Sequence, residues 1–193
     1  MAVAWEFHVI KERAIESEIL EQIIEEYGDN INITDIFSMD DWKWSNQQRL
    51  KDIAEINERL DGGKIITVEM QSEKWKSLGL CAEKGKAYLY TFWMNTEGHP
   101  EIDSDQITDA NKQYYCQAYS ILDKLIQKYK FSFNYIAIGL ESDIRYGEDI
   151  GKTILDSRNV IVWLMEDGNN TVLPKNLVRN KVSEELDSIT TGI

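Results

Sequence analysis

The sequence predicts an α+β fold with two N-terminal helices, an antiparallel or mixed sheet of about five strands, and one long amphipathic helix packed on a sheet face. Three observations predict it: apolar residues at helical spacing before residue 60, strand-like runs of β-branched and aromatic residues after it, and a long helical stripe near residue 120. The 193 residues, 42% of them hydrophobic, are enough for one core. We therefore expect one domain over 1–193, with an acidic helical part at 1–60 and the sheet and long helix at 61–193.

The first helix is expected at Lys11–Tyr27. Ile15, Ile19 and Ile23 recur at helical spacing, and Gly28 follows at a position where helices often end. Glutamates occupy the outer face of this segment, either as a solvated surface or as an acidic docking surface.

A second helix is expected at Ser45–Leu60, because Ser45 and Gln48 have the spacing of a capping box. The glycines of Asp61–Gly63 then end it. Ile31–Phe37, between the two helices, is interpreted as either a short strand or an irregular segment.

The sheet is expected to begin with Lys64–Gln71, a run rich in β-branched residues. Ser77–Ala82 and Lys86–Asn95 follow as a hairpin. Because the second arm is apolar on both faces, we expect a central strand that is covered on both sides, with Tyr90 and Trp93 in the core.

The long helix is expected at Ile107–Tyr129, where apolar residues hold one stripe over about six turns. Beyond it we expect strands at Phe133–Leu140 and Asn159–Met165, with a loop and a short helix between them at Glu141–Ser157. A weak polar helix is expected to follow Pro174 and to reach Leu186.

Charge limits the classes of partner. The net charge is −13, and residues 1–60 hold fourteen acidic residues against six basic ones. Without a basic patch to neutralise phosphate, DNA or RNA binding is not expected, whereas a basic protein partner is. No signal-peptide pattern or membrane-length apolar run occurs, so no membrane association is expected. Cys81 and Cys116 are interpreted as two buried thiols in a reducing cytoplasm.

The residues with the strongest case for chemistry are Asp61, Glu69 and Gln71. An acid followed by a strand that bears Glu-x-Gln resembles the way one nuclease superfamily holds a divalent metal. Asp61 lies close to Glu69 in sequence, within a glycine turn, so an exposed strand end is the simpler interpretation. With two histidines, no nucleophile elbow and no phosphate-binding glycine loop, we expect no catalytic residue, metal site or cofactor.

The expected function is that of a non-enzymatic inhibitor or interaction protein that binds a basic protein partner. Trp5 and Trp75 have charged neighbours, as do two tryptophans near residue 43, so some of the four are expected to be exposed anchors. The residues expected to contact the partner are carboxylates and tryptophans: Glu18, Glu21, Glu25, Asp40, Asp41, Trp42 and Trp44. In general character the chain is similar to the small acidic immunity proteins that neutralise bacterial nuclease toxins, and to phage-type inhibitors that mimic nucleic acid, although no motif identifies a family. The alternative is a metal-dependent nuclease or phosphodiesterase that uses Asp61, Glu69 and Gln71.

Overall fold

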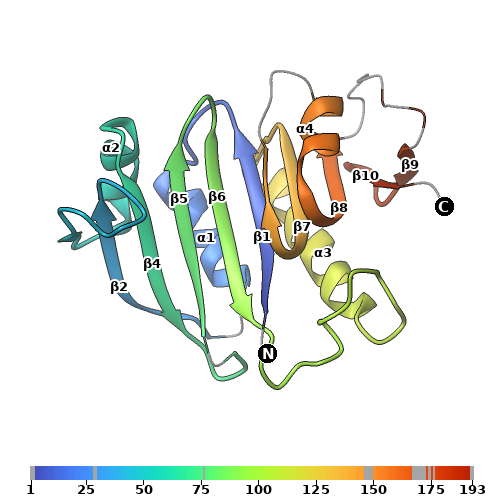
Figure 1. The fold of residues 1–193 in the computed structure, drawn as a ribbon, viewed down its shortest axis with the longest axis horizontal. Helices are drawn as coiled ribbons and strands as arrows, with labels where there is room; N and C mark the ends of the chain where they lie inside the picture. The colour runs from blue at the N-terminus through green and yellow to red at the C-terminus, as the bar shows by residue number, and fades with distance from the viewer. Residues whose placement is uncertain are drawn as a thin grey trace.

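Ten strands form one sheet in which every pair of neighbours is antiparallel (Figure 1). This count covers the residues that the computed structural model describes, which are 3–27, 30–75, 77–145, 150–166, 173, 175 and 177–191. The strand order is β3-β2-β4-β5-β6-β1-β7-β8-β10-β9. The strands are β1 (Ala4–Lys11), β2 (Asn32–Met39), β3 (Gln48–Arg49), β4 (Ile65–Gln71), β5 (Leu78–Lys84), β6 (Tyr88–Asn95), β7 (Tyr135–Asp143), β8 (Arg158–Glu166), β9 (Leu177–Lys181) and β10 (Leu186–Thr191).

The predicted fold class was wrong, because the sheet dominates the protein. Within the described part of the chain the α-helices are four and mostly short: α1 (Ser17–Tyr27), α2 (Ile56–Asp61), α3 (Lys112–Tyr129) and α4 (Ile150–Asp156). The five strands that the sequence predicted are present as β4 to β8, and the hairpin of β5 and β6 is confirmed. Five further strands double the size of the sheet.

The most consequential omission is β1, which lies between β6 and β7 near the middle of the sheet. Its residues alternate in a strand pattern, since Trp5, Phe7 and Val9 belong to the main core on one face. The helix expected from Lys11 therefore starts later, at Ser17. Its expected stop at Gly28 lies outside the described residues.

The segment 45–60 is not the continuous helix that was expected. It holds β3, a short 3-10 helix at Ile53–Glu55 and α2. The N-terminal cap is Asp52, whose carboxylate accepts the Ala54 amide at 3.0 Å. Ser45, which has the spacing of a capping box, instead hydrogen-bonds to Asp41. Ser45 therefore bonds to Asp41, four residues earlier in the chain, and does not cap a helix.

The prediction of a polar helix between Pro174 and Leu186 was also wrong, because β9 and β10 form a hairpin in this part of the chain. Pro174 itself is outside the described residues. A partly buried ion pair links the two strands, since Arg179 lies 2.6 Å from Asp187, which is 5% exposed. The long helix is confirmed in type, although it begins at Lys112 rather than Ile107. The short helix expected within 141–157 is confirmed as α4.

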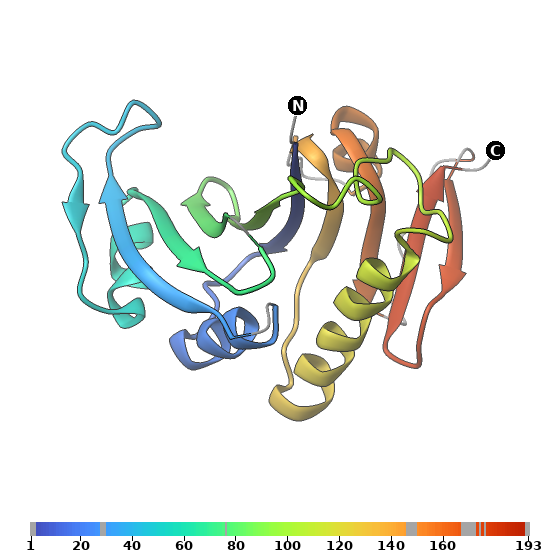
Figure 2. The ribbon, with the colours of Figure 1, turned by 90° about the horizontal axis from the view of Figure 1, so that it is seen from below.

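The helices divide the sheet into two unequal faces, which Figure 2 shows from below. On the first face, α1, α2 and α3 cover the main core, to which alternate side chains of β4, β5, β6, β1 and β7 contribute. On the second face, α4 covers a smaller core that includes Ile154, Trp163 and Met165. In the part of the chain that the structure describes, no helix covers the second face from β2 to β6 (Figure 1). No helix in the described ranges is long and apolar enough to cross a membrane.

Candidate functional site

Residues 40–47 form the loop between β2 and β3, which we call the tryptophan loop. The carboxylate of Asp41 holds the backbone of this loop. Asp41 accepts the amides of Lys43 at 2.8 Å and Ser45 at 3.2 Å, and the Ser45 hydroxyl at 2.9 Å. These bonds keep the pKa of Asp41 below its usual value, with the Ser45 amide as the largest cause. Trp44 and Asn46 adopt φ values of 65° and 53°, which non-glycine residues adopt only under local constraint.

The loop exposes two of the four tryptophans for which exposure was predicted. Trp42 is 54% exposed and Trp44 is 48% exposed, whereas Trp5 and Trp75 are buried in the main core. The indole N–H of Trp42 donates to a carboxylate oxygen of Glu83 at 3.3 Å. Trp42 therefore reaches the end of β5, on the second face of the sheet.

The carboxylates beside the tryptophan loop are paired with cations. Asp40 lies 2.5 Å from Lys64 and also accepts from Asn46, and these contacts lower its pKa, with Asn46 as the larger cause. Asp61 lies 2.7 Å from Lys84, and this hydrogen bond is the largest cause of its lowered pKa. The charge of Asp40, which begins the loop, is therefore balanced by Lys64.

The glutamates of α1 lie on the opposite side of the sheet from the tryptophan loop (Figure 2). Glu18, Glu21 and Glu25 are exposed on the outer surface of α1, which packs on the first face. Glu26 of the same helix forms an ion pair with Lys124 of α3 at 2.8 Å. The structure thus brings together the four expected partner-binding residues of the loop and separates them from the three on α1.

The three residues of the nuclease alternative do not converge either. Asp61 bonds to Lys84 and Tyr88, whose side chains point to the first face. Glu69 and Gln71 lie toward the far end of β4, about 13 Å and about 20 Å along the strand from Ile65 at ~3.3 Å per residue, and point to the second face. Among the residues with described positions, no group of three His, Cys, Asp or Glu side chains is placed to hold a metal ion.

The uncovered part of the second face, from β2 to β6, was missed by sequence reasoning; we call it the open face. Its side chains alternate with those of the main core along each strand, and strand pairing places them in rows across the sheet. It presents both carboxylates and aromatic rings, including those of Asp35, Phe37, Glu69, Glu83 and Trp93. Its signal in the sequence is the alternation of polar Thr67, Glu69 and Gln71 with apolar Ile66, Val68 and Met70.

Trp93 is the central aromatic residue of the open face, and it is half-buried rather than in the core as expected. Its indole packs directly on Gly79 of β5, since a Cβ at Gly79 would lie 2.8 Å from Cζ2 of the ring. Burial raises the pKa of the nearby Cys81 thiol to about 11, and the Trp93 side chain opposes this shift. Tyr90, on the other face of the same strand, is fully buried as predicted.

A buried polar pair borders the open face on β1. His8 is 3% exposed, and its Nδ1 lies 2.9 Å from the Thr91 hydroxyl on β6. Its Nε2 lies 3.5 Å from Glu6, whose carboxylate also accepts the Ser142 amide. These contacts fix Glu6 beside Trp93, to which it is paired across the strands.

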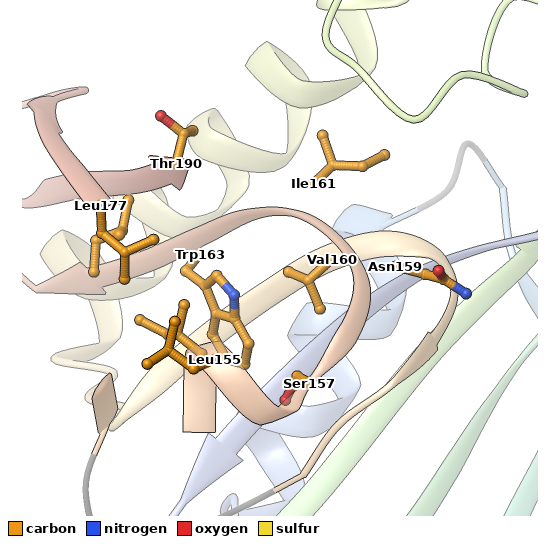
Figure 3. Close-up of a pocket in the computed structure, with 10 residues that line it drawn as sticks. Leu155, Ser157, Asn159, Val160, Ile161, Trp163, Leu177 and Thr190 are labelled. Carbon is orange, nitrogen blue, oxygen red and sulfur yellow. The ribbon is translucent and has the colours of Figure 1, made fainter. Parts of the chain in front are cut away.

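A separate pocket of about 230 Å³ lies under α4 (Figure 3). Figure 3 shows Leu155, Trp163 and Leu177 reaching it from α4, β8 and β9. Its lining residues are apolar or uncharged; the described ones include Ser157 and Thr190 but no carboxylate, imidazole or amine. The pocket therefore has no group suited to acid–base chemistry.

Comparisons with known proteins add no relative. No protein-family model, no curated protein and no solved structure matches the chain. The function is therefore argued from the tryptophan loop, the open face and the distribution of charge.

Proposed function

We propose that this chain is a non-enzymatic binding protein that associates with a basic protein partner through the tryptophan loop. One observation carries the proposal: Trp42 and Trp44 are about half exposed on a loop whose backbone Asp41 holds in a constrained conformation. Large exposed aromatic side chains are costly in water and are the residues that most often dominate binding energy at interfaces.

The constraint on the loop supports binding over an accidental exposure of tryptophan. Ordering a flexible loop on association costs free energy, and a loop that is already ordered avoids that cost. Backbone conformations with positive φ at Trp44 and Asn46 are retained in proteins where the surrounding contacts impose them, often at ligand-binding positions.

The charge of the chain supports a basic partner. With a net charge of −13, the protein attracts cationic surfaces over long range. The glutamates of α1 lie on the other side of the sheet, and charges farther apart than about 8 Å are largely screened at physiological salt. We therefore assign Glu18, Glu21 and Glu25 to attraction during approach, and Trp42 and Trp44 to the contact itself.

An inhibitor of a basic enzyme, such as an immunity protein that neutralises a nuclease toxin, is the class of binding protein that these features fit. Its acidic surface would compete for the Lys and Arg side chains that otherwise hold phosphate. The free thiols of Cys81 and Cys116 fit a reducing cytoplasm.

The test is capture of partners from the native host with the wild-type chain and with a Trp42→Ala/Trp44→Ala variant. We expect a basic protein to be retained by the wild type, with retention that falls as salt rises, and lost from the double variant. Leu155→Ala is the matched control, because Leu155 is 55% exposed on α4, away from the loop. Two results would contradict the proposal: retained proteins that are not basic, or a basic protein that the double variant captures as well as the wild type does.

A further inference from the structure

The open face carries a row of four residues that pairing sets side by side across β4, β5, β6 and β1. In this row Glu69 pairs with Gly79, Gly79 with Trp93, and Trp93 with Glu6. Because Gly79 has no side chain, the Trp93 indole occupies the space above β5. Neighbouring strands are about 4.8 Å apart, so the indole lies about one strand spacing from Glu69 and is flanked by Glu6 on its other side.

The position of the Trp93 indole is fixed rather than variable. Gly79 supports one side of the ring, because its missing side chain leaves the space that Cζ2 and Cε2 of the indole occupy. The ring is only half-buried, so part of its surface remains open to solvent on the uncovered part of the sheet. An aromatic surface held in this way is a platform on which a cation can stack.

The two carboxylates beside the platform differ in how many partners they have. One oxygen of Glu6, Oε2, accepts the Ser142 amide and lies 3.5 Å from Nε2 of His8. Glu69 is exposed, and within the described part of the chain its carboxylate has no hydrogen-bond or ion-pair partner. An acidic side chain next to an exposed aromatic ring complements a cation, and here the Glu69 carboxylate is available to accept hydrogen bonds from it.

A second polar group on the same face lacks a partner. Thr67 lies two residues before Glu69 on β4 and is 7% exposed, yet among the described residues its hydroxyl has no hydrogen-bond partner. Buried polar groups are nearly always hydrogen-bonded in folded proteins. The Thr67 hydroxyl is itself enclosed, so it lies beneath the surface that a partner would contact.

We propose that Trp93 and Glu69, with Glu6 on the far side of the ring, bind an arginine side chain of the basic partner. The guanidinium stacks on the indole and donates hydrogen bonds to the Glu69 carboxylate. Arginine fits better than lysine, because its guanidinium is planar, weakly hydrated and able to stack and donate in a fork at once. The inference rests on the proposed function and names the chemistry that the partner presents. Trp42 bonds to Glu83 on the same face, about 13 Å along β5 from Gly79 at ~3.3 Å per residue, so the tryptophan loop and this site lie on one face of the sheet.

The test uses a synthetic peptide of eight arginines as the probe and the full chain at low salt. Binding is measured by calorimetry, and the indole N–H signals are followed by nuclear magnetic resonance, with Trp93→Phe to assign the signal of Trp93. We expect the Trp93 signal to shift on titration. Glu69→Gln should weaken binding about tenfold, the effect of losing one charge-assisted hydrogen bond.

Glu58→Gln is the matched control, because it removes the same charge from an exposed position on α2, which covers the first face. It should leave the affinity unchanged, and thermal unfolding should show that both variants remain folded. Equal weakening by Glu69→Gln and Glu58→Gln would mean that the peptide binds the acidic surface in general, and would overturn the inference. So would a Trp93 signal that does not move.

The two proposals fail in different ways. If the tryptophan-loop variant loses a basic partner while Trp93 does not respond to the peptide, the arginine site is wrong and the proposed function stands. If Trp93 and Glu69 respond as expected but no basic partner is captured, the arginine site stands and the proposed function is wrong.

Discussion

Replacing Gly79 by alanine tests whether the absence of a side chain on β5 sets the position of the Trp93 indole. A Cβ at this position would lie 2.6 Å from the carbonyl oxygen of Val68 and 2.8 Å from Cζ2 of Trp93. Favourable carbon contacts are about 3.5–4.0 Å long, so both neighbours must shift. The Val68 oxygen belongs to the backbone of β4, which cannot move freely because it is paired on both sides.

The expected cost is that of overpacking a well-packed position, about 1–3 kcal/mol. In a domain of this size each kcal/mol lowers the melting temperature by roughly 2–4 °C, so a fall of roughly 2–12 °C is expected. In a Trp93→Ala background the part of the cost that is due to the indole should disappear, while the part that is due to the Val68 carbonyl should remain.

Urea and thermal unfolding followed by circular dichroism measure the change, and the indole signal of Trp93 reports its displacement. The control is Gly85→Ala in the turn between β5 and β6, where a Cβ would meet nothing within 4 Å. Its stability should stay within about 0.5 kcal/mol of the wild type. If Gly79→Ala unfolds at the same urea concentration as Gly85→Ala, and the Trp93 signal is unchanged, the packing argument is refuted.

Three further predictions concern thiols, acid stability and metals. Cys116, which was expected to be buried, is exposed, whereas burial raises the pKa of Cys81 to about 11. A thiol reagent at pH 8 should therefore label Cys116 alone in the folded protein, and labelling of both cysteines would contradict this. The folded-state pKa values of Asp41 and Asp61 are lowered, so their contribution to stability is complete above the unfolded pKa and declines as the pH falls below about 4; Asp61→Asn should flatten that decline in thermal unfolding, and an unaltered decline would count against it. Because Asp61 and Glu69 lie on opposite faces of the sheet, magnesium or manganese should leave the melting temperature unchanged, and a saturable rise that Glu69→Gln abolishes would revive the nuclease alternative.

Local patterns were sufficient for the strands that carry strong β-forming runs and for the long helix. Residues 64–71 and 86–95 alternate or stay apolar over a full strand length, so their type follows from their own side chains. The Ser45–Leu60 helix failed because the Asp41 carboxylate binds Ser45, and Asp52 caps a later start. Side-chain contacts of this kind compete with helix formation and are weak signals in a sequence.

The sequence by itself determined the acidity of the chain, the presence of Asp40–Trp44 as an aromatic and acidic loop, and most of the central strands. Only the tertiary structure decided that β1 pairs with β6 and β7, whose paired residues are at least 77 positions away in the chain, and which face of the sheet the helices cover. A two-residue period shows that the faces of a strand differ, but it does not say what lies on either face. For that reason Glu21 and Trp42 fall on opposite sides of the sheet. Trp93, a residue type that is usually buried, lies on the part of the second face that no described helix covers.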